Sequence, residues 1–329
     1  MRAPGFWDNP PSRPGVAARL LSPLGGLYAA GTARRLAKRS SYTSDAPVIC
    51  IGNLSAGGTG KTPTVIAFAE KIGLGVFVVS RGYGGTLEGP VLVDPKVHTA
   101  EQVGDEPLLL SAFTPVIVAK DRVAGAKFAD EQDARVILLD DGFQDPSLVK
   151  SLSIVVVDAA RGFGNGRCIP AGPLREPIHT GLSRADAVIS IGAPKLQERF
   201  TKAWGDAIQV PRLQGQMIAL ETGMPWKGRR VLAFAGIGYP EKFFATLREL
   251  GADVIDTIAL EDHAPLNATL IARLKRDAQA ARAQLICTEK DSVRLPEDLR
   301  REVLPLPVRL RFKNDAALND LLRPLGVRG

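Results

Sequence analysis

The chain has 329 residues, of which 45% are hydrophobic and 23% are charged. This is the composition of an ordinary globular protein, and the length allows a sizeable core divided over about two domains. The 3 cysteines, Cys50, Cys168 and Cys287, form no Cys-x-x-Cys pair, which excludes a disulfide-built scaffold and favours buried thiols in a reducing compartment.

Positive charge is concentrated in residues 1–45, which we call the arm. The formal net charge of the chain is +7, and the arm has seven basic side chains against Asp8 and Asp45. These are Arg2, Arg13, Arg19, Arg34, Arg35, Lys38 and Arg39. An anionic surface is therefore the natural partner of the arm.

The arm also contains an apolar stretch. Residues 20–33 are uncharged, but they are fewer than the about 20 apolar residues that a membrane-spanning helix needs. A secretory signal is excluded because prolines interrupt its pattern, at Pro10, Pro11, Pro14 and Pro23. Two interpretations stay open: a helix lying on a membrane surface, or a helix packed on the protein's own core.

Residues 55–62 have the pattern of a phosphate-binding loop. They follow the apolar run 48–51 and open an amphipathic run, so a strand is expected to turn through glycines into a helix whose N–H groups can hold nucleotide phosphates. The expected cofactor-binding residues are Ser55, Ala56, Gly57, Gly58, Thr59, Gly60, Lys61 and Thr62. Lys61 would reach the β and γ phosphates and Thr62 would ligate magnesium. Ser55 stands where the strict pattern has glycine.

Short apolar runs then alternate with helical stretches. The runs are 76–79, 91–93, 116–118, 136–139, 154–157 and 188–191. Because they are apolar on both faces, we expect a doubly wound, mainly parallel α/β sheet of the P-loop NTPase type. A second, smaller α/β unit is expected from residue 216, with strands near 231–235, 285–287 and 308–310. The expected domains are 1–45, 46–215 and 216–329.

Two adjacent carboxylates, Asp140 and Asp141, directly follow the run 136–139. An acidic residue at the end of a buried strand in a phosphate-loop protein usually holds magnesium. The alternative is a turn that uses Asp-Gly for its backbone preferences. Asp158 ends the next run without an evident partner, and we interpret it as structural.

Candidate residues for acting on the group that accepts the phosphate lie in three places. Asp105 and Glu106 could provide a base, or they could stabilise the start of a helix. Arg122 and Arg175 could neutralise phosphate charge, or they could be solvated loop residues. His263 follows two acids and, taken alone, is more typical of a surface histidine.

Taken together, these motifs resemble one family, the tetraacyldisaccharide 4′-kinases of lipid A biosynthesis, which are membrane-associated enzymes of Gram-negative bacteria. The resemblance covers nearly the whole chain and rests on the order and number of the matching segments. They are 20–24 with Tyr28, 52–54, 57–62, 80–84, 104–107, 140–144, 172–176, 262–263 and 288–291. The family's loop also accounts for Ser55.

The resemblance implies a kinase that moves the γ-phosphate of ATP to the 4′-hydroxyl of a tetraacylated glucosamine disaccharide 1-phosphate, which gives lipid IVA. It implies that Asp105 and His263 act as a pair that takes the hydroxyl proton. It implies that Lys61, Thr62, Asp140 and Asp141 bind phosphate and magnesium, and that Arg122 and Arg175 stabilise charge on the transferred phosphoryl group. It also implies supporting contacts by Glu106, Gln144 and Glu176. Arg81 and Tyr83 would contact the nucleotide or the lipid headgroup.

The resemblance also favours the membrane interpretation of the arm, because the family's acceptor lies in the bilayer. We therefore expect a peripheral protein on the cytoplasmic face of the inner membrane, acting as a monomer, with ATP and Mg²⁺ as cofactors. The second domain would bring His263 toward the first.

Other classes are disfavoured by specific residues. A GTPase switch needs Asn-Lys-x-Asp, and residues 288–291 have the wrong spacing. A membrane-riding partitioning ATPase would carry a second lysine where Ala56 stands. Nucleic-acid binding is suggested only by the pI of about 9.4, and the arm lacks interleaved aromatic residues beyond Trp7 and Tyr28. We therefore expect no nucleic-acid partner.

Overall fold

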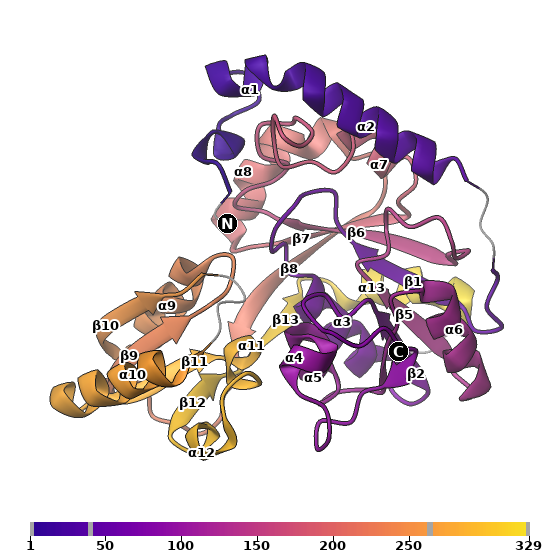
Figure 1. The fold of residues 1–329 in the computed structure, drawn as a ribbon. Helices are drawn as coiled ribbons and strands as arrows, with labels where there is room; N and C mark the ends of the chain where they lie inside the picture. The colour runs from indigo at the N-terminus through magenta and orange to yellow at the C-terminus, as the bar shows by residue number, and fades with distance from the viewer. Residues whose placement is uncertain (1–2, 39–41, 262–265, 327–329) are drawn as a thin grey trace.

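The fold is built around a nine-stranded sheet. The computed structural model describes residues 3–38, 42–261 and 266–326, and the strand order of this sheet is β13-β8-β7-β6-β1-β5-β2-β4-β3 (Figure 1). The strands are β1 (Val48–Gly52), β2 (Val76–Ser80), β3 (Val91–Leu92), β4 (Val116–Val118), β5 (Val136–Asp140), β6 (Leu152–Asp158), β7 (Ala187–Ile191), β8 (Arg212–Ala219) and β13 (Val308–Phe312). β3 and β13 run antiparallel to β4 and β8, and the central ladders are parallel.

Helices cover both faces of this sheet, because its central strands are apolar on both sides. In β1, Ile49 and Ile51 pack with residues of α3 (Lys61–Ile72), α4 (Ala100–Val103), α5 (Asp105–Leu110) and α13 (Asp315–Leu322). Val48 and Cys50 point to the other face and pack with α6 (Arg122–Glu131), α7 (Ile178–Leu182) and α8 (Pro194–Trp204). The expected doubly wound, mainly parallel sheet is therefore confirmed.

A smaller parallel sheet forms a second unit, which Figure 1 shows below and to the left of the large sheet. Its order is β10-β9-β11-β12, from β9 (Arg230–Ala235), β10 (Asp253–Ala259), β11 (Gln284–Thr288) and β12 (Val303–Leu306). Its helices are α9 (Pro240–Glu249), α10 (Ala268–Ala281), α11 (Glu289–Ser292) and α12 (Glu297–Arg300). Phe244 of α9 and Leu274 of α10 belong to two separate apolar clusters of this unit.

The chain passes between the two sheets twice. β8 stays in the large sheet as far as Ala219, and after β12 the chain returns to it as β13, where Leu310 pairs with Met217. The sequence places residues 308–310 in the second unit and a boundary at residue 216, inside β8. The structure differs because an alternating strand pattern does not identify the strand that will pair with it.

The arm packs on the large-sheet unit through one side. It contains a short 3₁₀ turn (Gly5–Asp8), α1 (Val16–Leu20) and α2 (Ser22–Leu36). The inner side is formed by the buried small residues Ala18, Gly25 and Thr32, and a Cβ at Gly25 would lie 2.9 Å from the carbonyl oxygen of Cys168. The arm is thus docked on the core by residues small enough for close approach.

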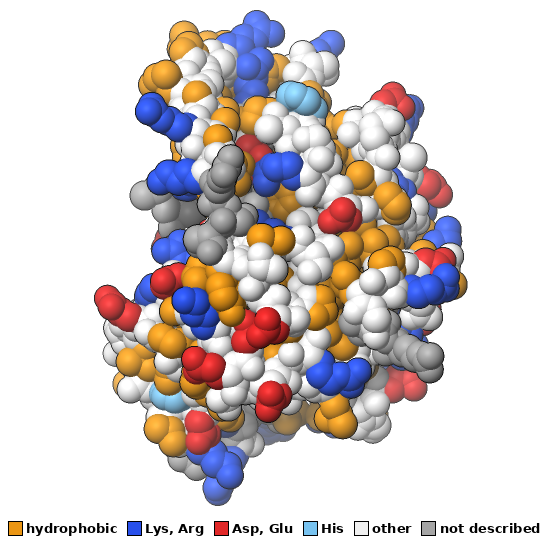
Figure 2. Space-filling view, turned by 90° about the vertical axis from the view of Figure 1, so that its right-hand side faces the viewer, with side chains coloured by type: hydrophobic (Ala, Val, Ile, Leu, Met, Phe, Trp, Pro, Cys, Tyr) orange, Lys and Arg blue, Asp and Glu red, His pale blue; other side chains and the backbone are white. Residues whose placement is uncertain are grey.

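The outer side of the arm is apolar and basic. Its large hydrophobic side chains are exposed, namely Val16, Leu20, Leu24, Leu27 and Tyr28, and Arg34 and Arg35 are exposed in the last turn of α2. Figure 2 shows hydrophobic and basic side chains lying next to one another at the top of the molecule, over the arm. Among the described helices, none combines the length and apolar character that crossing a membrane requires.

Candidate active site

The phosphate-binding loop joins the end of β1 to the start of α3. Gly57 and Gly60 have φ angles of 108° and 97°, a region that side-chain-bearing residues rarely adopt. Asn53 is fully buried and donates from Nδ2 to Thr59 Oγ1 at 3.1 Å. The N–H of Ala56 donates to the carbonyl oxygen of Pro173 at 2.7 Å. The loop is therefore fixed in a shape that leaves the first N–H groups of α3 available to an anion.

Asp140 lies beside this loop because β1 and β5 are parallel neighbours, with Ile51 opposite Asp140. Its side chain is 3% exposed, and Oδ2 accepts a hydrogen bond from Ser80 Oγ at 3.1 Å. Oδ1 is buried and has no hydrogen-bond partner among the described residues. Burial, followed by the charges of Glu106 and Asp141, raises the pKa of Asp140 to about 7. The negative charge of the Asp140 carboxylate is therefore not balanced by its surroundings.

Asp141 has the opposite environment. Its φ is 52°, and Oδ1 and Oδ2 accept hydrogen bonds from Arg175 at 2.9 and 3.2 Å. Lys61 Nζ lies 3.7 Å from Oδ2. Burial opposes ionisation here, but Lys61 and Arg175 outweigh it and hold the pKa of Asp141 below its usual value. The pKa values of the two adjacent carboxylates are thus shifted in opposite directions, because Asp141 is the one that lies against Lys61 and Arg175.

Gln144 and Glu176 connect the phosphate-binding loop to the segment that carries Arg175. Gln144 Nε2 donates to the carbonyl oxygen of Asn53 at 2.8 Å and to Glu176 Oε1 at 3.0 Å. Glu176 is 1% exposed and is also paired with Arg184. These contacts fix the orientation of the neighbouring Arg175, which donates to Gln144 Oε1 at 3.3 Å.

Arg122 lies at the start of α6 and is 7% exposed. It donates to the carbonyl oxygen of Asp141 and to Asp145 Oδ2, both at 2.7 Å. In this structure Arg122 therefore contacts the backbone that carries the carboxylate pair.

Asp105 and Glu106 begin α5 and face the second unit. Glu106 Oε1 is 3.3 Å from Lys290 Nζ, and Asp105 Oδ2 is 3.6 Å from Arg294 Nε. The Glu106 charge also contributes to the raised pKa of Asp140, so the acidic pair and the carboxylates after β5 belong to one electrostatic site.

Arg81 and Tyr83 are exposed in the segment after β2. A Cβ at Gly104 would lie 2.8 Å from the carbonyl oxygen of Tyr83, so this segment passes next to the start of α5. His263 lies outside the described residues. The structure therefore brings the phosphate loop, the carboxylate pair, Arg175 and the acidic pair together, and it places Arg81 and Tyr83 at their edge.

Four residues of this site were given no individual role from the sequence. Asn53 and Ser80 are polar residues at the ends of buried strands, which is a usable signal in a doubly wound sheet. Lys290 and Arg294 come from the second unit, and nothing local in the sequence indicates that they meet α5.

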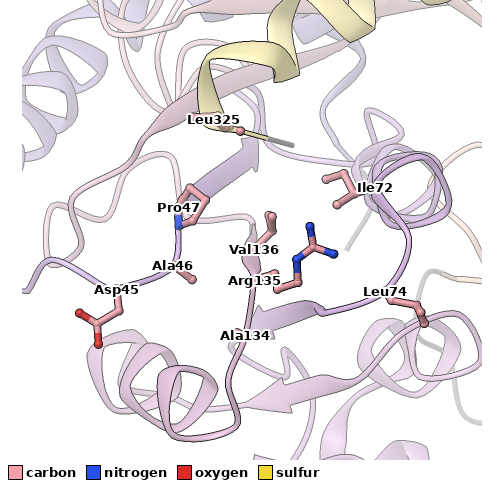
Figure 3. Close-up of a pocket in the computed structure, with 10 residues that line it drawn as sticks. Asp45, Ala46, Pro47, Ile72, Leu74, Ala134, Arg135, Val136 and Leu325 are labelled. Carbon is pink, nitrogen blue, oxygen red and sulfur yellow. The ribbon is translucent and has the colours of Figure 1, made fainter. Parts of the chain in front are cut away.

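A cavity of about 310 Å³ lies elsewhere (Figure 3). Asp45, Pro47 and Arg135 line it together with Leu74 and Leu325. These residues lie near the starts of β1 and β5, whereas the phosphate-binding loop follows the end of β1, about 16 Å away along a five-residue strand. The cavity is therefore separate from the candidate active site.

Comparison with known proteins agrees with this geometry. The model of the tetraacyldisaccharide-1-P 4′-kinase family matches residues 17–325. The chain belongs to this family. The family suggested by the sequence motifs is therefore confirmed, and so is the expected class of enzyme, a kinase.

Curated relatives named tetraacyldisaccharide 4′-kinase match nearly the full length. The protein from Dinoroseobacter shibae is 58% identical, over 99% of this chain and 98% of the relative. The protein from Jannaschia sp. is 57% identical, over 98% and 99%. The protein from Rhodospirillum centenum is 47% identical, over 99% and 97%.

A solved structure of the Aquifex aeolicus enzyme LpxK, in complex with ATP, has a similar fold. The TM-score is 0.72 at 24% sequence identity, over 94% of this chain and 99% of that chain. At this identity the likeness supports the overall fold.

Proposed function

We propose that this chain is a kinase that transfers the γ-phosphate of ATP to the 4′-hydroxyl of a tetraacyldisaccharide 1-phosphate and so forms lipid IVA. Membership of the tetraacyldisaccharide-1-P 4′-kinase family supports this. The single observation in the structure that carries it is the position of Lys61, between a glycine-rich loop at a helix start and the carboxylate pair Asp140 and Asp141.

The residues present fit a nucleotide with Mg²⁺. Thr62 is the second residue of α3, and the buried Oδ1 of Asp140 has no hydrogen-bond partner among the described residues. Hydroxyl and carboxylate oxygens are the ligands that Mg²⁺ prefers, so Thr62, Asp140 and Asp141 would hold it. When bound, the ion would neutralise charge on the transferred phosphoryl group. Residues 55–60 and Lys61 would bind the phosphates, with Gln144 fixing the loop.

Proton removal from the acceptor needs a base near α5. We assign it to Asp105 together with His263, the carboxylate orienting the imidazole. Arg175 and Arg122 would stabilise the charge of the transferred phosphoryl group. Glu106 would position Lys290, and Glu176 would position Arg184. Arg81 and Tyr83 are exposed beside the start of α5, where a headgroup could approach.

The arm would hold the enzyme on the membrane that contains its acceptor. Its exposed apolar side chains and the neighbouring Arg34 and Arg35 are the two signals that binding to an anionic interface requires. We therefore place the protein peripherally on the cytoplasmic face of the inner membrane, as a monomer. Residues 1–45 would be the anchoring segment, the large-sheet unit the kinase core, and the unit built on β9 to β12 the part that supplies His263 to the site.

Transfer of labelled phosphate from ATP to the disaccharide acceptor tests the function. Lys61→Ala should lower the rate at least about 100-fold, because the lysine's charge is lost at the phosphates. Lys71→Ala, at the other end of α3, is the matched control and should keep wild-type activity and the same circular dichroism. Turnover of ATP that does not depend on the acceptor, or full activity of Lys61→Ala, would contradict the proposal.

The proton-transfer pair can be tested by steady-state kinetics. Asp105→Ala and His263→Ala should each lower kcat by about 10²–10⁴-fold, the usual contribution of a positioned base. The double variant should be far more active than the product of the single losses predicts, because the two residues act as a unit. Losses that multiply would show that they work independently.

Membrane binding by the arm can be measured by sedimentation with vesicles of anionic phospholipid. Leu20 and Leu27 are 75% and 71% exposed. Replacing both with Asp should weaken partitioning by about tenfold or more, because two apolar side chains no longer enter the interface. Leu74→Asp with Val97→Asp is the control, since these exposed residues lie outside the arm. Equal partitioning of the two double variants would exclude the arm as the anchor.

A further inference from the structure

Residues 288–291 form a distinct motif that has no role in the proposed function so far. Within it, Asp291 is fully buried. Its two carboxylate oxygens each accept from the N–H of Gly236 at 3.1 Å, and Oδ2 also accepts from Thr288 Oγ1 at 2.6 Å. Asp291 is further paired with Arg294. A carboxylate with this many donors is a fixed anchor within the second unit.

Arg294 extends from Asp291 toward the large-sheet unit. Its side chain is 8% exposed, and its Nε lies 3.6 Å from Asp105 Oδ2. Two nearly buried carboxylates, one from each unit, therefore share one guanidinium. Because the planar guanidinium has donors in a rigid fork, it can hold both carboxylates in a fixed relative position.

A second ion pair lies alongside. Lys290 Nζ is 3.3 Å from Glu106 Oε1, so the adjacent acids at the start of α5 face two basic residues, Lys290 in α11 and Arg294 in the turn that follows it. α11 and α5 lie next to each other where the two units meet (Figure 1).

Buried ion pairs add little net stability, since desolvation offsets most of their attraction. Their best-attested use is to select one arrangement of the parts that they join. In this protein the parts are the start of α5, which carries the expected base, and the second unit.

Resting on the proposed function, we propose that Arg294, anchored by Asp291, is a positioning residue that orients the Asp105 carboxylate for proton transfer. Lys290 supports the same alignment through Glu106. The second unit thereby sets the geometry of the base.

The experiment compares Arg294→Gln, Asp105→Asn and the double variant in the full-length protein, assayed with ATP and the disaccharide acceptor. Arg294→Gln should lower kcat by about 10- to 100-fold, because a misplaced reacting group costs on that order. The KM for ATP should stay within about twofold, since the side chain of Arg294 lies against Asp105 and Asp291. The double variant should be about as slow as Asp105→Asn alone.

Two further variants control for folding. Arg273→Gln removes an exposed arginine of α10, paired with Asp277 within the same helix, and should leave kcat unchanged. Arg294→Gln leaves the buried Asp291 without this cation, so its melting temperature is compared with that of wild type. If it is unfolded, Arg294→Met combined with Asp291→Asn carries the test, because both charges are removed together.

A folded Arg294 variant with wild-type kcat would overturn the inference. So would a loss that multiplies with that of Asp105→Asn, which would indicate a general structural role. In both cases the wild-type protein still phosphorylates the acceptor, and the proposed function stands. A wild-type protein that transfers no phosphate to the acceptor would contradict the proposed function, and the positioning role with it.

Discussion

The site depends on one electrostatic constraint: two consecutive carboxylates, Asp140 buried and Asp141 half-buried, lie beside a phosphate-binding loop. Parallel pairing of β1 with β5 makes this unavoidable, because the loop follows one strand and the carboxylates end the other. Two like charges cannot both be stable there without compensation. Asp141 is compensated by Lys61 and Arg175, whereas Asp140 receives one hydroxyl hydrogen bond, from Ser80, and keeps a raised pKa.

Much of the surrounding structure serves this arrangement. Arg175 is aligned on Asp141 by Gln144, and Arg122 holds the backbone carbonyl of Asp141. The negative charge of Glu106 further raises the pKa of Asp140. Glu106 itself lies against Lys290 of the second unit. Among the described residues, both oxygens of Asp141 thus have partners, whereas Oδ1 of Asp140 has none. A cation arriving with a nucleotide would remove this asymmetry.

The local part of this site could be predicted from the sequence. Residues 55–62 and Asp140 with Asp141 were found because glycine spacing and acids after an apolar run are short-range signals. The assembly of distant segments could not be predicted in this way. Asp158, interpreted as lacking a partner, is paired with Lys242 of α9 at 2.6 Å, and β13 returns to the large sheet. Such contacts depend on how whole units pack together, and neither segment has a local sequence pattern that indicates its partner.

The central claim, that Asp140 is the uncompensated carboxylate that receives the metal–nucleotide complex, is tested most directly by the protons released on binding of Mg·ATP. Calorimetric titrations at pH 6.5 in two buffers of different ionisation enthalpy measure this number. With the pKa of Asp140 raised to about 7, most of the free protein carries this proton at pH 6.5. Binding should therefore release a substantial fraction of one proton, less as the pH rises through 8, and none in Asp140→Asn. Tight binding with equal heats in both buffers at pH 6.5 would contradict the account.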